Sequence, residues 1–258
     1  MSGERPSDRG RRGRRDNTAP APRSGDAPAE RTASKTSEID AFLAKARTMT
    51  PGNPRAGGRG RLIFALDATM SRQPTWDTAC SLQAEMFKET AAIGGLDVQL
   101  IYFRGFGECR ASRWVSDPNA LADLMVRIDC RGGHTQIRKV LARTRDESRK
   151  TPVQALVYIG DCMEESIDDL CAIAGEIGLT GTRVFMFHEG RDAIAERAFR
   201  EIARLTNGAY CRFDQGSAHQ LRELLSAVAV YAAGGRTALV DYGRKSGAGA
   251  QRLLEQLK

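Results

Sequence analysis

Short apolar runs alternate along this chain with longer stretches in which apolar residues recur every three or four positions. A short run bounded by turn residues is typical of a strand buried on both faces of a sheet, and the longer period is typical of an amphipathic helix. The sequence predicts strands over residues 62–66, 98–103, 108–115, 153–159, 182–187 and 209–213. It predicts helices over residues 75–93, 119–128, 136–149, 166–177, 191–206 and 218–233.

The order of these elements defines the predicted fold class. Strands that alternate with helices favour a doubly wound α/β fold, in which helices cover both faces of a mostly parallel sheet. Residues 108–115 predict one antiparallel strand at the edge of that sheet. We therefore expect a single Rossmann-like α/β domain over residues 61–234, followed by a C-terminal extension over residues 235–258.

The N-terminal part of the chain differs in composition from the rest. Residues 1–36 are rich in Arg, Pro and Ser and carry almost no large apolar side chain, which predicts a disordered basic tail. Residues 37–60 predict a short helix and a Gly- and Pro-rich linker. Residues 1–61 hold 14 Lys and Arg against 7 Asp and Glu, whereas the remainder is neutral overall, so the net charge of +7 belongs to the N-terminal part and says nothing about a basic face on the domain.

Several classes of protein are disfavoured by the sequence. No apolar run approaches the roughly 18 residues that a membrane span needs. The N-terminal arginines are not followed by the apolar segment of a secretory signal, so we expect a cytoplasmic protein. In that compartment the six cysteines are expected to be free thiols, most of them packed in the core. Cys162 has the alternative of a redox-sensitive thiol, because it follows Asp161.

Oxygen-bearing side chains follow the predicted buried strands. Asp67, Thr69 and Ser71 come directly after the first strand, and Asp161 comes after the strand over 153–159. Thr135 lies in the loop Gly132–Thr135, before the helix over 136–149. Ligands of doubly wound sheets bind at the carboxyl ends of the strands. Because carboxylates and hydroxyls are hard oxygen ligands, the sequence predicts a small divalent cation such as Mg²⁺ at this edge.

These residues carry a resemblance to a known family. Asp-x-Thr-x-Ser after the first strand, Gly-Gly-x-Thr in a central loop and Asp after the central strand resemble the metal-ion-dependent adhesion site (MIDAS) of von Willebrand factor A (VWA) domains. The family pattern has Ser where this chain has Thr69, which keeps the hydroxyl. The resemblance covers about residues 60–234 and is closest to intracellular bacterial members.

The resemblance implies a site and a function. Asp67, Thr69, Ser71, Thr135 and Asp161 would hold Mg²⁺ or Mn²⁺, and an Asp or Glu of a protein partner would complete the coordination. It also implies a non-enzymatic adaptor, with partners in the class of ATPase or chaperone complexes and no membrane contact. His134, Trp76 and Glu164 are candidates for the partner-binding rim. For Glu164 and its neighbour Glu165, the alternative is that they complement the dipole of the helix that follows them.

Two other functions stay open from the sequence. The Arg-rich tail suggests nonspecific nucleic-acid binding, which would weaken with salt and be lost on deleting residues 1–35. An Asp after a buried strand also resembles the nucleophile of haloacid-dehalogenase-type phosphatases, which use Mg²⁺. That family has a second Asp, acting as general acid, at the position of Thr69, so a phosphatase is the weaker alternative.

Overall fold

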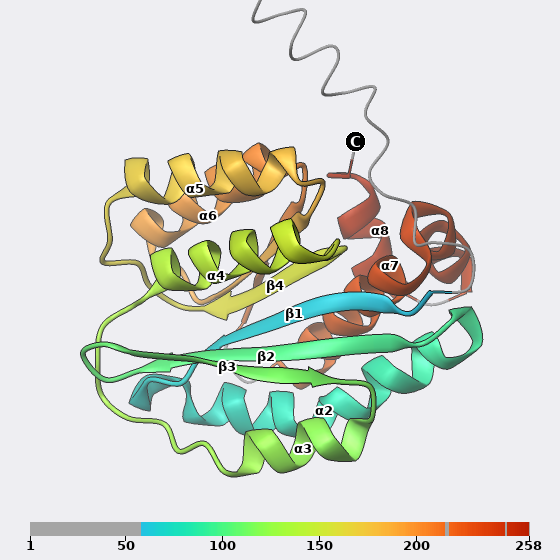
Figure 1. The fold of residues 1–258 in the computed structure, drawn as a ribbon, viewed down its shortest axis with the longest axis horizontal. Coiled ribbons are helices and arrows are strands. Elements are labelled where there is room, and N and C mark those ends of the chain that lie inside the picture. The colour runs from blue at the N-terminus through green and yellow to red at the C-terminus, as the bar shows by residue number, and fades with distance from the viewer. Residues whose placement is uncertain (1–57, 215–216, 246, 258) are drawn as a thin grey trace, which may run out of the picture. The chain divides into compact units, whose positions relative to one another are not determined.

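The computed structural model describes residues 58–214, 217–245 and 247–257 (Figure 1). The basic tail predicted over 1–36, and the predicted helix and linker over 37–60 up to residue 57, lie outside these residues. Among the helices that are described, none combines the length and the apolar character that a membrane span requires.

Within the described residues, six strands form one sheet in the order β3-β2-β1-β4-β5-β6. Their bounds are β1 (Gly60–Asp67), β2 (Leu96–Arg104), β3 (Glu108–Val115), β4 (Ala155–Gly160), β5 (Arg183–Glu189) and β6 (Ala209–Phe213). Neighbouring strands pair in parallel except for β3, which pairs with β2 in the antiparallel sense. The predicted fold class, a doubly wound sheet with one antiparallel edge strand, is confirmed.

Helices cover both faces of this sheet (Figure 1). Their bounds are α2 (Gln73–Thr90), α3 (Pro118–Val126), α4 (Ile137–Lys150), α5 (Ile167–Leu179), α6 (Ala193–Leu205), α7 (Ala218–Lys245) and α8 (Gly247–Leu254). Buried residues of α2, α3, α7 and α8 share one core cluster, and those of α4, α5 and α6 share the other. Alternation along β1 shows why both layers are needed, since Phe64 belongs to the first cluster and Ile63 to the second.

The connections of β1 and β4 position the candidate site. The two strands are parallel neighbours, with Leu66 opposite Ile159. From β1 the chain continues outward to β2 on one side, whereas β5 and β6 lie beyond β4 on the other side. Ligands of doubly wound sheets bind outside the carboxyl ends of the strands, at such a reversal of strand order. Asp67, which ends β1, and Asp161, which follows β4, therefore lie at the end of the sheet where a ligand is expected.

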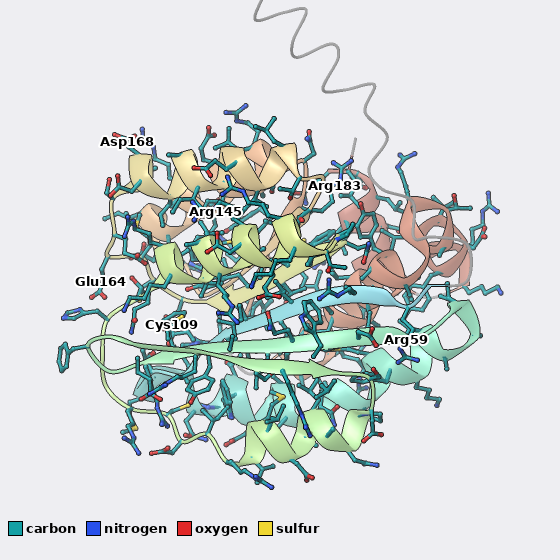
Figure 2. All side chains as sticks on the ribbon, viewed as in Figure 1. Arg59, Cys109, Arg145, Glu164, Asp168 and Arg183 are labelled. Carbon is teal, nitrogen blue, oxygen red and sulfur yellow. The ribbon has the colours of Figure 1, made fainter. Side chains whose placement is uncertain are left out.

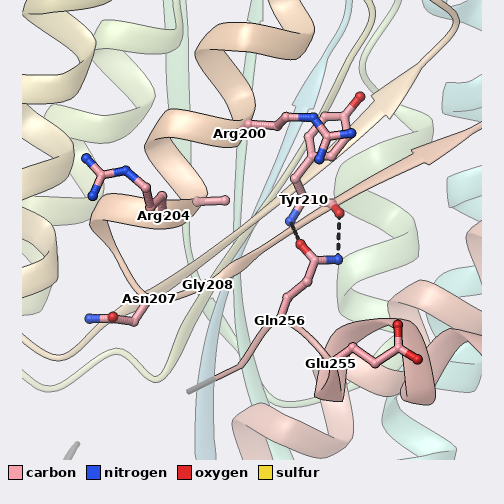
Figure 3. Close-up of a pocket in the computed structure, with 8 residues that line it drawn as sticks. Arg200, Arg204, Asn207, Gly208, Tyr210, Glu255 and Gln256 are labelled. Atoms are coloured by element: carbon pink, nitrogen blue, oxygen red, sulfur yellow. Dashed lines mark hydrogen bonds between the residues drawn. The ribbon is translucent and has the colours of Figure 1, made fainter.

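The C-terminal segment packs into the hydrophobic core on one face of the sheet. The helix of α7 is interrupted at Gly235, whose φ of 69° is accessible to glycine without strain. Beyond it, Leu253 and Leu257 are buried in the core cluster that contains α2 and α7. Figure 3 shows the Gln256 amide paired with the backbone of Tyr210, accepting from its N–H at 2.8 Å and donating to its carbonyl at 2.9 Å. This side chain therefore occupies part of the open edge of β6.

Gly208 is required where the chain enters β6. A Cβ at this position would lie 1.9 Å from the carbonyl oxygen of Val184, a backbone atom that cannot move aside. We expect Gly208→Ala to lower the free energy of unfolding by about 1–3 kcal/mol or more. The matched control is Gly175→Ala, because a Cβ there meets open space inside α5 and should stabilise the helix by up to about 1 kcal/mol. Denaturant unfolding measures both, and equal midpoints for the two variants would contradict the prediction.

Candidate metal centre

The loop after β1 is held by its own side chains. Asp67 is 2% exposed, and its Oδ1 accepts a hydrogen bond from the Thr69 backbone N–H at 2.7 Å. This two-residue turn is a local arrangement that Asp favours. It brings the Thr69 hydroxyl within 3.3 Å of the Ser71 hydroxyl. The three residues of the Asp-x-Thr-x-Ser motif are thus collected on one short turn, as the sequence predicts.

The loop after β4 adds the second carboxylate. Ser71 Oγ donates to Asp161 Oδ2 at 3.3 Å, across 90 positions of sequence. Asp67, Thr69, Ser71 and Asp161 therefore form one connected group at the carboxyl ends of β1 and β4. The Asp161 side chain is 26% exposed, whereas Asp67 and Thr69 are buried. The group opens to solvent on the Asp161 side.

Two carboxylate oxygens of this group have no hydrogen-bond partner. Asp67 Oδ2 and Asp161 Oδ1 are both buried and unpaired. Leaving a carboxylate oxygen buried without a partner is costly, and a bound cation removes that cost. The atoms of this group that could bind a metal are all oxygens, which suits Mg²⁺ or Mn²⁺. No cluster of three or more His, Cys, Asp or Glu suited to a metal occurs among the described residues, so this candidate centre depends on its hydroxyls.

Thr135 lies in a neighbouring loop but interacts with Glu164. Its backbone N–H donates to Glu164 Oε2 at 3.0 Å, and its hydroxyl accepts from the Glu164 backbone N–H at 3.1 Å. The loop is attached to the motif through the Arg131 N–H, which donates to the Ala68 carbonyl at 2.9 Å. No hydrogen bond between Thr135 and the other four predicted ligands is found within the described part of the chain. The role of Thr135 as a metal ligand stays a prediction.

Glu165 supports α4 rather than the helix that follows it, whereas Glu164 bonds to the loop before α4. Glu165 accepts from the first backbone N–H groups of α4, those of Ile137 at 2.5 Å and Arg138 at 3.0 Å. Gln136, the N-cap residue of α4, makes no capping hydrogen bond of its own. The helix that follows, α5, is capped by Ser166 instead. The interpretation that Glu165 complements the dipole of the helix that follows it is therefore wrong. Glu165 complements the dipole of α4 instead.

The three predicted rim residues have different environments. The His134 side chain is 63% exposed and its Nδ1 lies 3.1 Å from Glu164 Oε2, whose side chain is 48% exposed (Figure 2 labels Glu164). Trp76 is 2% exposed, and its indole N–H donates to the Met125 carbonyl at 3.4 Å. The prediction for Trp76 is corrected, because helix α2 points this ring into the core. His134 and Glu164 are placed at the surface.

Two exposed apolar residues near this edge were not predicted. Met70 lies inside the motif, between Thr69 and Ser71, and is 64% exposed. Phe106, at the turn between β2 and β3, is 86% exposed, and its ring meets the edge of the His134 ring at 5.2 Å between centroids. The signal for Phe106 was in the sequence, since an aromatic residue between two glycines stands at the tip of a turn.

A buried ion pair beside Asp161 was also missed. Arg72 is 3% exposed, and its guanidinium forms an ion pair with Glu189, which ends β5 and is 2% exposed. The same guanidinium donates to Thr75 Oγ1 at 2.7 Å, and its second nitrogen lies 3.4 Å from Asp161 Oδ2. The rule that located Asp67 and Asp161, namely the carboxyl ends of strands, also points to Glu189.

Burial favours the neutral forms of two further groups near Asp161. Burial raises the pKa of the Cys162 thiol to about 12, and the Asp161 carboxylate adds to the rise. Cys162 is a free thiol, and its raised pKa disfavours the thiolate form that a redox-sensitive cysteine uses. Burial lowers the pKa of His188, which is fully buried with Nδ1 2.9 Å from the Tyr210 hydroxyl and Nε2 3.2 Å from the Asp161 carbonyl.

Asp67 should make the metal-free protein less stable as pH rises. Burial raises the pKa of Asp67 to about 6, and the Asp161 carboxylate adds to the rise, while hydrogen bonds from Thr69 oppose it. The folded state then binds more protons than the unfolded state between about pH 4 and pH 6, so the free energy of unfolding falls through that window, by roughly 3 kcal/mol. Asp67→Asn, which stays neutral, should remove this part of the pH dependence.

Unfolding in EDTA across pH 4 to 7 measures the Asp67 effect. Asp123→Asn is the matched control, because Asp123 lies exposed on α3. The same pH slope in the Asp67 and Asp123 variants would refute the assignment.

Among the comparisons with known proteins, the one with solved structures shows the fold. No protein-family model matches the chain, and no curated protein is significantly similar to it in sequence. Among solved structures, the VWA domain of SpRpn10 is 12% identical over 69% of this chain and 97% of that chain, with a TM-score of 0.50. The vWF domain of the type V pilus tip protein Mfa5 from Porphyromonas gingivalis is 11% identical over 74% of this chain and 97% of that chain, with a TM-score of 0.53.

A third solved structure holds a metal in a MIDAS motif of its own. Proximal thread matrix protein 1 from the mussel byssus, with a zinc-occupied MIDAS motif, is 14% identical over 68% of this chain and 46% of that chain, with a TM-score of 0.53. At these identities the similarity establishes the fold alone. The chain therefore has the α/β fold of VWA domains.

Proposed function

We propose that this protein is a non-enzymatic, metal-dependent protein-binding module that captures a carboxylate of its partner. The observation that carries the proposal is the pair of buried, unpartnered carboxylate oxygens, Asp67 Oδ2 and Asp161 Oδ1, beside two hydroxyls at the strand ends. Mg²⁺ or Mn²⁺ at this group would supply a Lewis-acidic position for a carboxylate from outside. The VWA fold and the zinc-occupied MIDAS of one structural neighbour support the same class of function.

The five proposed ligands would have two different roles. Asp67 and Asp161 supply the negative charge that attracts a cation, and Thr69, Ser71 and Thr135 supply neutral oxygens. Only two of the five proposed ligands are anionic, so their charges would balance that of a divalent cation without exceeding it. The cation would keep a coordination position open to an outside oxygen, and a hard cation of this kind binds a carboxylate oxygen more strongly than a neutral one.

The rim defines the chemistry of the partner. His134 and Glu164 offer polar contacts, and Met70 and Phe106 offer exposed apolar surface around the same edge. We infer a partner segment in which an Asp or Glu stands beside an apolar side chain, of the kind that an adaptor for ATPase or chaperone assemblies would bind. Catalysis is not part of the proposal, because Thr69 replaces the acidic residue that a phosphatase of this type needs.

Affinity capture with and without metal tests the proposed function. The full chain, immobilised, should retain a partner in Mg²⁺ and release it in EDTA, and the Asp161→Ala chain should retain it in neither condition. Replacing the partner's Asp or Glu residues one at a time with Asn or Gln should then locate the captured carboxylate. Retention that is unchanged in EDTA would refute the metal-dependent mechanism.

A further inference from the structure

Arg72 places a fixed positive charge beside the candidate centre. Its second guanidinium nitrogen lies 3.4 Å from Asp161 Oδ2, the same oxygen that accepts the hydrogen bond from Ser71. The guanidinium cannot leave this position easily, because Glu189 and Thr75 hold its other nitrogen. Arginine does not lose its proton in proteins, so the charge is permanent.

The environment makes this charge effective. Arg72 and Glu189 are almost fully buried, so solvent screens their interactions with nearby groups weakly. One guanidinium nitrogen of Arg72 reaches Asp161 Oδ2 while the other pairs with Glu189, so Arg72 is the member of the pair that contacts the centre. Its charge therefore opposes any cation that shares Asp161.

We propose that Arg72 is a built-in counter-charge that neutralises Asp161 in the metal-free protein and lowers the affinity of the centre for a divalent cation. This inference rests on the proposed function, because it takes Asp161 as a metal ligand. A partner's carboxylate would bring a negative charge to the centre, and this charge would compensate the positive charge of Arg72. Binding of the cation and binding of the partner would then strengthen each other, as linkage requires.

The two members of the buried pair should affect metal affinity in opposite directions. Arg72→Gln removes a positive charge and should tighten Mn²⁺ binding on the order of tenfold. Glu189→Gln leaves the Arg72 charge without compensation and should weaken Mn²⁺ binding on the order of tenfold. The double variant should return towards the wild-type affinity. A purely structural role for the pair predicts something different, namely that both single variants weaken binding.

Titration calorimetry and Mn²⁺ paramagnetic resonance on the full chain measure these affinities with the metal alone. Arg222→Gln, at an exposed ion pair between α7 and α2, is the matched control and should leave Mn²⁺ affinity unchanged. If Arg72→Gln does not fold, the double variant must bind at least tenfold more tightly than Glu189→Gln. Weaker binding by both single variants, or equal binding by all, overturns the role of Arg72 while leaving the proposed centre intact. Absence of Mn²⁺ binding in every variant overturns the proposed centre and this inference with it.

Discussion

Adding Mg²⁺ should raise the free energy of unfolding of the wild-type chain, and the rise should vanish in Asp161→Ala. A ligand that binds only the folded state stabilises it by RT ln(1 + [L]/Kd), which is about 2.7 kcal/mol at a hundredfold excess over Kd. Asp161 contributes a buried unpartnered oxygen and the acceptor for Ser71, so its removal takes away one of two anionic ligands. Thermal or denaturant unfolding over a Mg²⁺ series measures the shift, and Mn²⁺ provides a second series.

The comparison must use the rise in the free energy of unfolding that Mg²⁺ causes in each variant, rather than the free energy of unfolding itself. Asp161→Ala also removes the contact with Arg72, so its stability in EDTA will differ from that of the wild type. Asp123→Ala controls for the loss of one negative charge at an exposed site and should keep the full increment. A saturable increment that survives in Asp161→Ala would place the metal elsewhere. No increment in the wild type would mean that this fold carries no functional centre at the predicted position.

The fold was predictable because its signals are local and repeated. Each central strand is a run of apolar residues such as Leu62–Leu66, and each helix shows its own period, so the alternation alone defines a doubly wound sheet. The motif residues were predictable for a related reason. Asp67 and Asp161 follow strands, and parallel strands that are neighbours bring their carboxyl ends to one edge.

The remaining features depend on contacts that the one-dimensional pattern does not contain. Trp76 follows the motif closely in sequence, but the helical period of α2 turns it towards Met125 and the core. Glu165 stands before α5, yet its carboxylate reaches α4 because Gln136 leaves that helix without a cap. Arg72 and Glu189 are separated by more than a hundred positions, so only the sheet order brings them together.

Breaking the Arg72–Glu189 pair should be among the most destabilising single changes in this domain. Arg72→Met leaves Glu189 buried with one oxygen already unpartnered, and removing one member of a buried ion pair typically costs about 3–5 kcal/mol. Replacing both members with apolar residues, Arg72→Met with Glu189→Leu, removes the stranded charge and should recover most of that loss. Denaturant unfolding of the two single variants and the double variant, all in EDTA, gives the coupling free energy.

The exposed pair Arg222–Glu85 provides the matched comparison for this cycle. It joins two helices, α7 and α2, and its side chains are 49% and 41% exposed. Solvent screening should limit its coupling to about 1 kcal/mol or less. If the double variant at Arg72 and Glu189 loses as much stability as the two single variants together, the two charges do not depend on each other. Arg72 would then owe its position to Thr75 rather than to Glu189, and its proposed electrostatic role would lose the support of the ion pair.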